Sequence, residues 1–201
     1  HTSSFIKNAA PQARYEGGIY RGHRTELEQV HIVLGFQGIP RISENYQTAQ
    51  LLSIITGGGM SSRLFQEIRE KRGLVYSIYS SNSGYRDDGM FEVYAGTGEQ
   101  SVKELIPVVC EELNKLRSER VDDKELARAK AQLKANILMG GESMLSRANR
   151  QATYLMNFGK AENMERTLES IDAVTSDNIR DMASRFFSST PTLAALGPLD
   201  Q

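Results

Sequence analysis

The apolar positions of the chain follow two different periods, and each change of period marks a boundary between predicted elements. Where apolar and polar residues alternate, as they do in a half-buried strand, we predict strands. These cover residues 17–23, 28–37, 74–84, 89–96 and 192–196. A hairpin over residues 24–27 is expected to join the first two strands, and the Asp88-Gly89 turn is expected to join the next two.

Elsewhere the apolar residues recur every three or four positions, which predicts amphipathic helices. These helices cover residues 43–55, 61–71, 102–116, 143–158, 164–171 and 176–187. Another helix begins at Asp122, which together with Glu125 resembles a capping box, and its apolar stripe extends to Ile137. Ser43 is the expected N-cap of the first helix, and a run of glycines ends that helix.

The order of these elements predicts the fold class. Strands followed by helices, with one strand returning at the end, are typical of an α+β domain. We therefore predict an antiparallel-rich mixed sheet with helices packed mainly on one face. Residues 1–14 are expected to form a linker or N-terminal extension, and residues 15–201 a single α+β domain.

Composition narrows the function classes without selecting one. The 201 residues carry a formal net charge of −1, so no bulk attraction to nucleic acid or to an anionic membrane is expected. No stretch reaches the ~20 apolar residues of a membrane-spanning helix. The single cysteine, Cys110, is expected to be a buried small side chain rather than a reactive thiol. The start at His1, without an initiator Met, suggests a processed product or a fragment of something longer.

Arg69 and Tyr76 offer the most specific candidate chemistry. Arg69 lies near the end of a predicted helix, and Tyr76 follows seven positions later in a predicted strand. A guanidinium presents planar donors to a peptide carbonyl or a carboxylate, and a phenol can donate to an oxyanion. The alternative, which spacing alone favours, is an Arg69 paired with Glu67 or Glu70, beside a tyrosine that fills the interface between sheet and helix.

The segment around these residues resembles the C-terminal half of the pitrilysin-like zinc peptidases, in particular their bacterial and mitochondrial processing-peptidase branch. Residues 62–77 read S-R-L-F-Q-E-I-R-E-K-R-G-L-V-Y-S. The family's segment, S-R-L-F/Y-x-x-I/L-R-E-x-x-G-L-x-Y-S, carries an Arg and a Tyr that grip the substrate backbone near the scissile bond. These two positions match Arg69 and Tyr76. The resemblance covers nearly the whole chain, including residues 147–159.

A second pair, Arg72 and Tyr79, has the same spacing and stays as the runner-up, because the G-L-V-Y-S run matches the family's tyrosine to Tyr76. Strict alternation along the strand is expected to place the two tyrosines on opposite faces. One face would hold Leu74, Tyr76, Ile78 and Ser80, and the other Val75, Ser77 and Tyr79.

Three consecutive glycines, Gly57, Gly58 and Gly59, precede the predicted helix over 61–71. Backbone N–H groups in such a place can hold a phosphate, but no P-loop pattern accompanies them, and a turn between two helices is the simpler interpretation. In the processing-peptidase branch, a glycine-rich loop of the non-catalytic subunit is tied to substrate handling. The resemblance therefore makes this run a candidate substrate loop.

The family's zinc signature, H-x-x-E-H on a helix, is absent from the sequence. The nearest imitation begins at His23 and has Glu26 in place, but Leu27 stands where the second histidine would be. His31 is too distant to replace it in an extended segment. We therefore predict no metal site and no catalytic residue in this chain alone.

The resemblance implies the C-terminal, non-zinc half of a zinc-dependent endopeptidase that acts on extended peptides or presequences. The chain alone is expected to be inactive, because zinc would be bound by an N-terminal half, in the same polypeptide or in another subunit. A dimer is expected, in the bacterial cytoplasm or, alternatively, in the mitochondrial matrix. Two other functions stay open: a catalytically silent scaffold or core subunit, and a stand-alone peptide-binding module.

Overall fold

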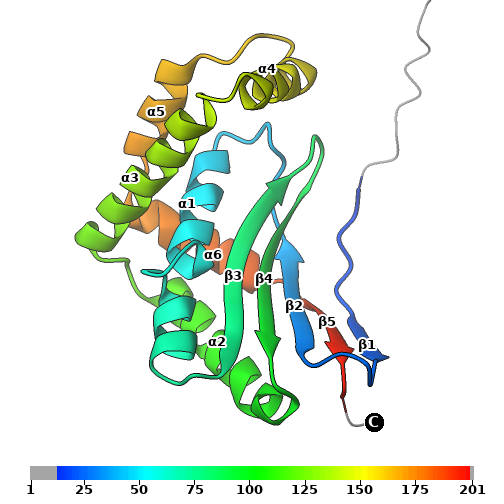
Figure 1. Cartoon of the computed structure of the whole chain (residues 1–201). Coiled ribbons are helices and arrows are strands. Elements are labelled where there is room, and N and C mark those ends of the chain that lie inside the picture. The colour runs from blue at the N-terminus through cyan, green and yellow to red at the C-terminus, as the bar shows by residue number, and fades with distance from the viewer. Residues whose placement is uncertain (1–12, 200–201) are drawn as a thin grey trace, which may run out of the picture.

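The computed structural model describes residues 13–199, and these form a five-stranded mixed sheet with helices on one side (Figure 1). The strands are β1 (Ile19–His23), β2 (Val30–Gln37), β3 (Val75–Gly84), β4 (Gly89–Thr97) and β5 (Thr192–Gly197). Their order across the sheet is β1-β5-β2-β4-β3. Only β1 and β5 pair in parallel, and the other neighbours are antiparallel. The predicted antiparallel-rich α+β fold is thus confirmed.

The expected hairpin between the first two strands is wrong. Strand β5 lies between β1 and β2, with Ala194 paired to Tyr20 on one side and to Val33 on the other. A turn does form over residues 24–27, where the Leu27 N–H donates to the Arg24 carbonyl, but the Arg24 N–H donates to Gly197 at the end of β5 and not to β2. The returning strand is therefore an interior strand of the sheet.

The helices begin and end close to the predicted positions. They are α1 (Tyr46–Gly57), α2 (Val102–Ser118), α3 (Asp123–Gly140), α4 (Met144–Phe158), α5 (Met164–Asp172) and α6 (Ser176–Phe187), with a π-helix, η1 (Phe65–Glu70), and a short 3₁₀ turn, η2 (Glu99–Ser101). Asp122 caps α3 as expected, but Ser43 does not cap α1, which starts after Asn45. None of the described helices is long and apolar enough to cross a membrane.

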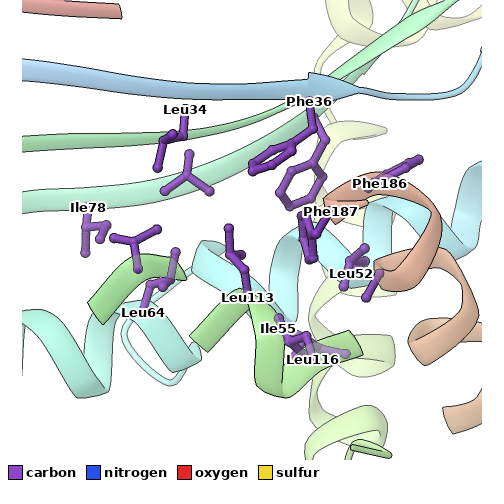
Figure 2. Close-up of a cluster of buried hydrophobic side chains, with 14 of the residues drawn as sticks. Leu34, Phe36, Leu52, Ile55, Leu64, Ile78, Leu113, Leu116, Phe186 and Phe187 are labelled. Carbon is purple, nitrogen blue, oxygen red and sulfur yellow. The ribbon is translucent and has the colours of Figure 1, made fainter. Parts of the chain in front are cut away.

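The core lies between the covered face of the sheet and the helices. Aromatic rings from both layers meet at its centre, where Phe187 of α6 lies 5.1 Å from Phe36 and 5.3 Å from Phe91, centroid to centroid. Around them pack side chains from four helical elements, as Figure 2 shows for Leu52, Ile55, Leu64, Leu113, Leu116 and Phe186. The opposite face of the sheet carries no helix in the described residues.

The predicted domain boundaries stay a prediction. Most of the expected extension over residues 1–14, and residues 200–201, lie outside the described residues. The backbone N–H of Ala13 donates to the Asp87 carboxylate at 3.2 Å.

Candidate functional site

Arg69 lies on η1, a helical turn wider than an α-helix. The amide of Lys71 donates to the carbonyl of Gln66, five residues back, and that of Leu74 donates to Ile68. Ile68 is fully buried and holds the turn against the core. Arg69, the next residue, is exposed, and its guanidinium carbon lies 5.0 Å from the centre of the Phe65 ring. This cation–π contact supports the side chain without using its hydrogen-bond donors.

The carboxylates near Arg69 are directed to other cations. Glu67 accepts from Lys71 at 2.7 Å and from Arg72 at 3.0 Å. The hydrogen bond from Lys71 contributes most to holding the pKa of Glu67 below its ordinary value. Among residues 13–199, no carboxylate lies within ion-pair distance of Arg69, and Glu70 forms no ion pair either. The alternative of an Arg69 paired with Glu67 or Glu70 therefore has no support in the geometry.

Tyr76 owes its position to an irregularity in β3. Val75 pairs with Thr97 and Ser77 with the adjacent Gly96, so Tyr76 is an extra residue, a β-bulge. Val75 is buried and Tyr76 is 62% exposed. The predicted alternation is wrong here, because the bulge moves Tyr76 out of the set that holds Ile78.

The faces of β3 after the bulge therefore differ from the prediction. Ile78 and Ser80 are buried on the helix side, where Val75 joins them. Tyr76 and Tyr79 are both exposed, rather than separated onto a buried and an open face.

The runner-up pair is engaged within the chain. Arg72 is held by Glu67 through two hydrogen bonds, and it lies 3.9 Å from Glu104. The Tyr79 ring stacks on Tyr94, with centroids 4.8 Å apart. By contrast, Tyr76 has no side-chain hydrogen bond or ring contact among the described residues. Arg69 and Tyr76 are thus the pair with uncommitted donors.

Sequence reasoning missed the polar chain that continues from Tyr79 across the open face of the sheet. The Tyr94 hydroxyl lies 2.7 Å from Nδ1 of His31 on β2. The Asp88-Gly89 turn could have predicted that Tyr79 and Tyr94 are opposite each other. Once Gly84 is opposite Gly89, counting back along the hairpin puts Tyr79 opposite Tyr94.

The glycine run is packed rather than free. Gly57 is the last residue of α1 and is buried against β3. The carbonyl of Gly58 accepts from Gln132 of α3 at 2.8 Å. The link between α1 (ending at Gly57) and η1 (beginning at Phe65) therefore starts later in the chain than predicted, and Met60 and Ser61 are exposed within it.

Neither candidate histidine is placed to hold zinc. His23 ends β1 with Nδ1 2.7 Å from the carbonyl of Leu199, and His31 bonds to Tyr94. Within residues 13–199, no group of three or more His, Cys, Asp or Glu side chains could hold a metal ion. The described side chains therefore do not fit a zinc ion.

Cys110 lies on the exposed side of α2, so the expectation of a buried side chain is wrong. Partial burial of the sulfur still raises the pKa of its thiol. The reactive thiolate is therefore disfavoured, and no acid–base chemistry is assigned to it.

The sequence model of a protein family described as "Peptidase M16 inactive domain" matches residues 4–133 of this chain. The chain belongs to the peptidase M16 family, as its inactive, C-terminal domain. The resemblance to the zinc peptidases is confirmed. An uncharacterized zinc protease of Rickettsia felis is 41% identical over 189 residues, which are 94% of this chain and 45% of that protein. The M16 domain described here thus spans less than half the length of this relative.

Solved structures share the fold of this M16 domain. A chain of complex III2 from Candida albicans superposes with a TM-score of 0.81 at 20% identity, over 91% of this chain and 46% of that one. A protease from Helicobacter pylori gives 0.78 at 22% identity, over 90% and 44%. At this identity, the likeness shows the fold alone.

Proposed function

We propose that this M16 domain is the substrate-binding half of a zinc-dependent endopeptidase and closes over a zinc site supplied by a separate half. The observation that carries the proposal is the pair Arg69 and Tyr76. Both side chains are exposed, and neither has a hydrogen-bond or ion-pair partner among the described residues. Arg69 and Tyr76 project from neighbouring elements, η1 and β3. The two elements are in contact, since the amide of Leu74, just before β3, donates to the carbonyl of Ile68 in η1.

The two groups suit the binding of an extended peptide. The Arg69 guanidinium presents several N–H donors in one plane and can donate to carbonyl oxygens of the substrate backbone. The Tyr76 phenol can donate to the oxygen of the scissile carbonyl as negative charge develops there. Neither group hydrolyses a peptide unaided. This half therefore orients the substrate, and the half that binds zinc supplies the hydrolytic chemistry.

The relatives support the zinc half as the partner. The Rickettsia felis zinc protease is more than twice as long as the part this chain matches. The branch, the partnership and the compartment are part of the proposal: a member of the processing-peptidase branch that acts as a dimer on peptides or presequences, in the bacterial cytoplasm or, alternatively, in the mitochondrial matrix. The run of Gly57, Gly58 and Gly59 stays a candidate substrate loop, although Gly57 and Gly58 also pack within the domain.

One observation favours a second function, a catalytically silent core subunit. The Candida albicans neighbour belongs to complex III2, so the same fold occurs within a large assembly. The two functions differ in whether Arg69 and Tyr76 contact a substrate. A stand-alone peptide-binding module would differ again, since it would bind peptides without any zinc half.

The test is cleavage of a quenched fluorescent peptide by this chain, by the zinc-bearing half, and by their mixture. We expect activity only in the mixture, with its loss on adding a chelator. Arg69→Ala and Tyr76→Phe should each lower kcat/KM at least tenfold, since loss of one oxyanion donor costs about 10²–10³ in rate.

The chain provides a matched control in its second Arg–Tyr pair. Arg72→Ala and Tyr79→Phe remove the same groups at the same spacing, yet they should change kcat/KM by less than threefold. If an active mixture is indifferent to both members of the first pair, the site assignment is wrong. A folded, zinc-loaded mixture that cleaves nothing would favour the core-subunit function.

A further inference from the structure

A cavity of about 730 Å³ lies between the start of α2 and the side of the sheet that β1 and β5 form. We call it the α2–β5 cavity. Most of its lining is apolar, and its size is within the range of small-molecule sites, about 300–1,000 Å³. The apolar side chains that line it are Ile32, Val102, Ile106, Leu193, Ala195 and Leu199.

Strand pairing builds the floor of this cavity. Arg21 of β1 pairs with Ala195 of β5, and Ala195 pairs with Ile32 of β2, so the three side chains point to one face of the sheet. Val102 and Ile106, one turn apart on α2, line the cavity from the helix side. Figure 1 shows β1 on the side of the sheet away from α1 and α3. The floor therefore extends past the helices to the edge of the sheet.

The charged groups of the cavity come from both of its walls. Arg21 reaches it from the sheet and Lys103 from α2, and neither forms an ion pair within the part of the chain that the structure describes. Glu99 also lines the cavity, but it lies beyond ion-pair distance of both cations. Two cations and one carboxylate leave one net positive charge. A ligand with a single negative charge complements this arrangement, and Glu99 disfavours a second one.

The body of such a ligand has to be apolar, because the cavity offers it few hydrogen-bond partners. Strand β5 pairs with β1 on one side and with β2 on the other, so the backbone groups of residues 193–196 are already used within the sheet. A peptide lying there would bring N–H and C=O groups that find no partner on β5, which is costly. A methylene chain has no such groups.

We propose that the α2–β5 cavity binds a long-chain monocarboxylate, the chemical class of the fatty acids. The chain lies against the apolar lining, and the carboxylate accepts hydrogen bonds from Arg21 and Lys103. The planar donors of a guanidinium match the two oxygens of a carboxylate.

This site is separate from the candidate substrate pair. Tyr76 lies on β3, at the opposite edge of the sheet from β1. Four strand spacings of ~4.8 Å put the two edges about 19 Å apart. Binding in the cavity therefore does not depend on the proposed function.

The test is calorimetric titration of this chain with dodecanoate, below the concentration at which it forms micelles. Two further probes separate the parts of the ligand. Butyrate keeps the carboxylate without the long chain, and dodecyltrimethylammonium keeps the chain but reverses the charge. We expect dodecanoate to bind at least tenfold more tightly than either.

The double variant Arg21→Gln/Lys103→Gln should raise the Kd of dodecanoate at least tenfold. Both side chains are exposed, so the far-UV spectrum and Tm should be unchanged. Arg86→Gln/Lys124→Gln is the matched control, because it removes the same two charges at exposed positions outside the cavity. It should alter Kd by less than twofold. In a methyl NMR spectrum, dodecanoate should shift the resonances of Leu193 and leave those of Leu145 in place.

Four results would overturn the proposal. The first is no binding of dodecanoate, and the second is equal binding of dodecyltrimethylammonium, which would show apolar adhesion without recognition of charge. The third is an unchanged Kd in the double variant at Arg21 and Lys103. The fourth is tighter binding of acetyl-trileucine with a free carboxylate, which would assign the cavity to the C-terminus of a peptide. None of these measurements involves cleavage, so their outcome stands apart from the test of Arg69 and Tyr76.

Discussion

Replacing Gly57 by alanine tests whether the glycine run is fixed by packing. A Cβ at Gly57 would lie 2.5 Å from the backbone nitrogen of Ser80 and 2.9 Å from the carbonyl carbon of Tyr79. These are atoms of the β3 backbone, so α1 or β3 must shift. Overpacking costs about 1–3 kcal/mol, and alanine recovers at most ~1 kcal/mol of helix propensity at the end of α1. We expect Gly57→Ala to lower the free energy of unfolding by about 1–2 kcal/mol, or roughly 2–8 °C in Tm.

Gly59→Ala is the control for this prediction. Its Cβ would lie 3.3 Å from Nε2 of Gln132, the far end of a flexible side chain. Its free energy of unfolding should stay within about 0.5 kcal/mol of the parent. Urea unfolding followed by circular dichroism measures both variants. A Gly57→Ala protein as stable as the parent would refute the packing argument. A stable Gly59→Ala protein with reduced cleavage in the assembled enzyme would instead show that substrate contacts the run at Gly59.

Two further predictions concern charged groups. The Arg63 guanidinium donates to both carboxylate oxygens of Glu125, at 2.9 and 2.8 Å, and both side chains are less than one-fifth exposed. Arg63→Met and Glu125→Gln should each cost about 1–3 kcal/mol, and a double-mutant cycle by urea unfolding should give a coupling of at least ~1 kcal/mol; additive losses would contradict this. The hydrogen bond from Lys71 lowers the pKa of Glu67 in the folded state. The ionised Glu67 therefore stabilises the folded protein above its ordinary pKa of about 4.5, and this stabilisation is lost as the pH falls below that value. Glu67→Gln should therefore reduce the fall of Tm on acidification below that pH, and an unchanged Tm–pH curve would show that the pair contributes nothing.

The local pattern of apolar and polar residues was sufficient to predict most helices and strands, but it did not predict which strands pair with each other. The amphipathic stripes that predict α2, α3 and α6 reflect packing against a single core, so periodicity finds them. The pairing of β1 with β5 depends instead on contact between the two ends of the chain. No local signal distinguishes that arrangement from a hairpin over residues 24–27, because both satisfy the same alternation.

The candidate site shows the same division. Residue types and spacing identify Arg69 and Tyr76, but their environments follow from long-range contacts. Glu67 pairs with Lys71 and Arg72 rather than with Arg69, because residues four or five positions along a helical turn lie on one side of it and residues two positions apart do not. Glu125 was expected to complete a cap on α3, yet it reaches Arg63 from another part of the chain.

The two irregular elements beside the link over residues 71–74 give the strongest physical argument for the proposed role. A regular strand would place Tyr76 on the same face as Ile78, against the helices, where its hydroxyl would need a buried partner. The β-bulge places Val75 there and leaves Tyr76 exposed. The π turn of η1 adds its own extra residue just before the link. Both irregularities weaken regular hydrogen bonding, and both recur near functional sites in proteins. Beside these irregularities Ile68 and Val75 pack in the core, while Arg69 and Tyr76 are exposed to solvent with their donors free.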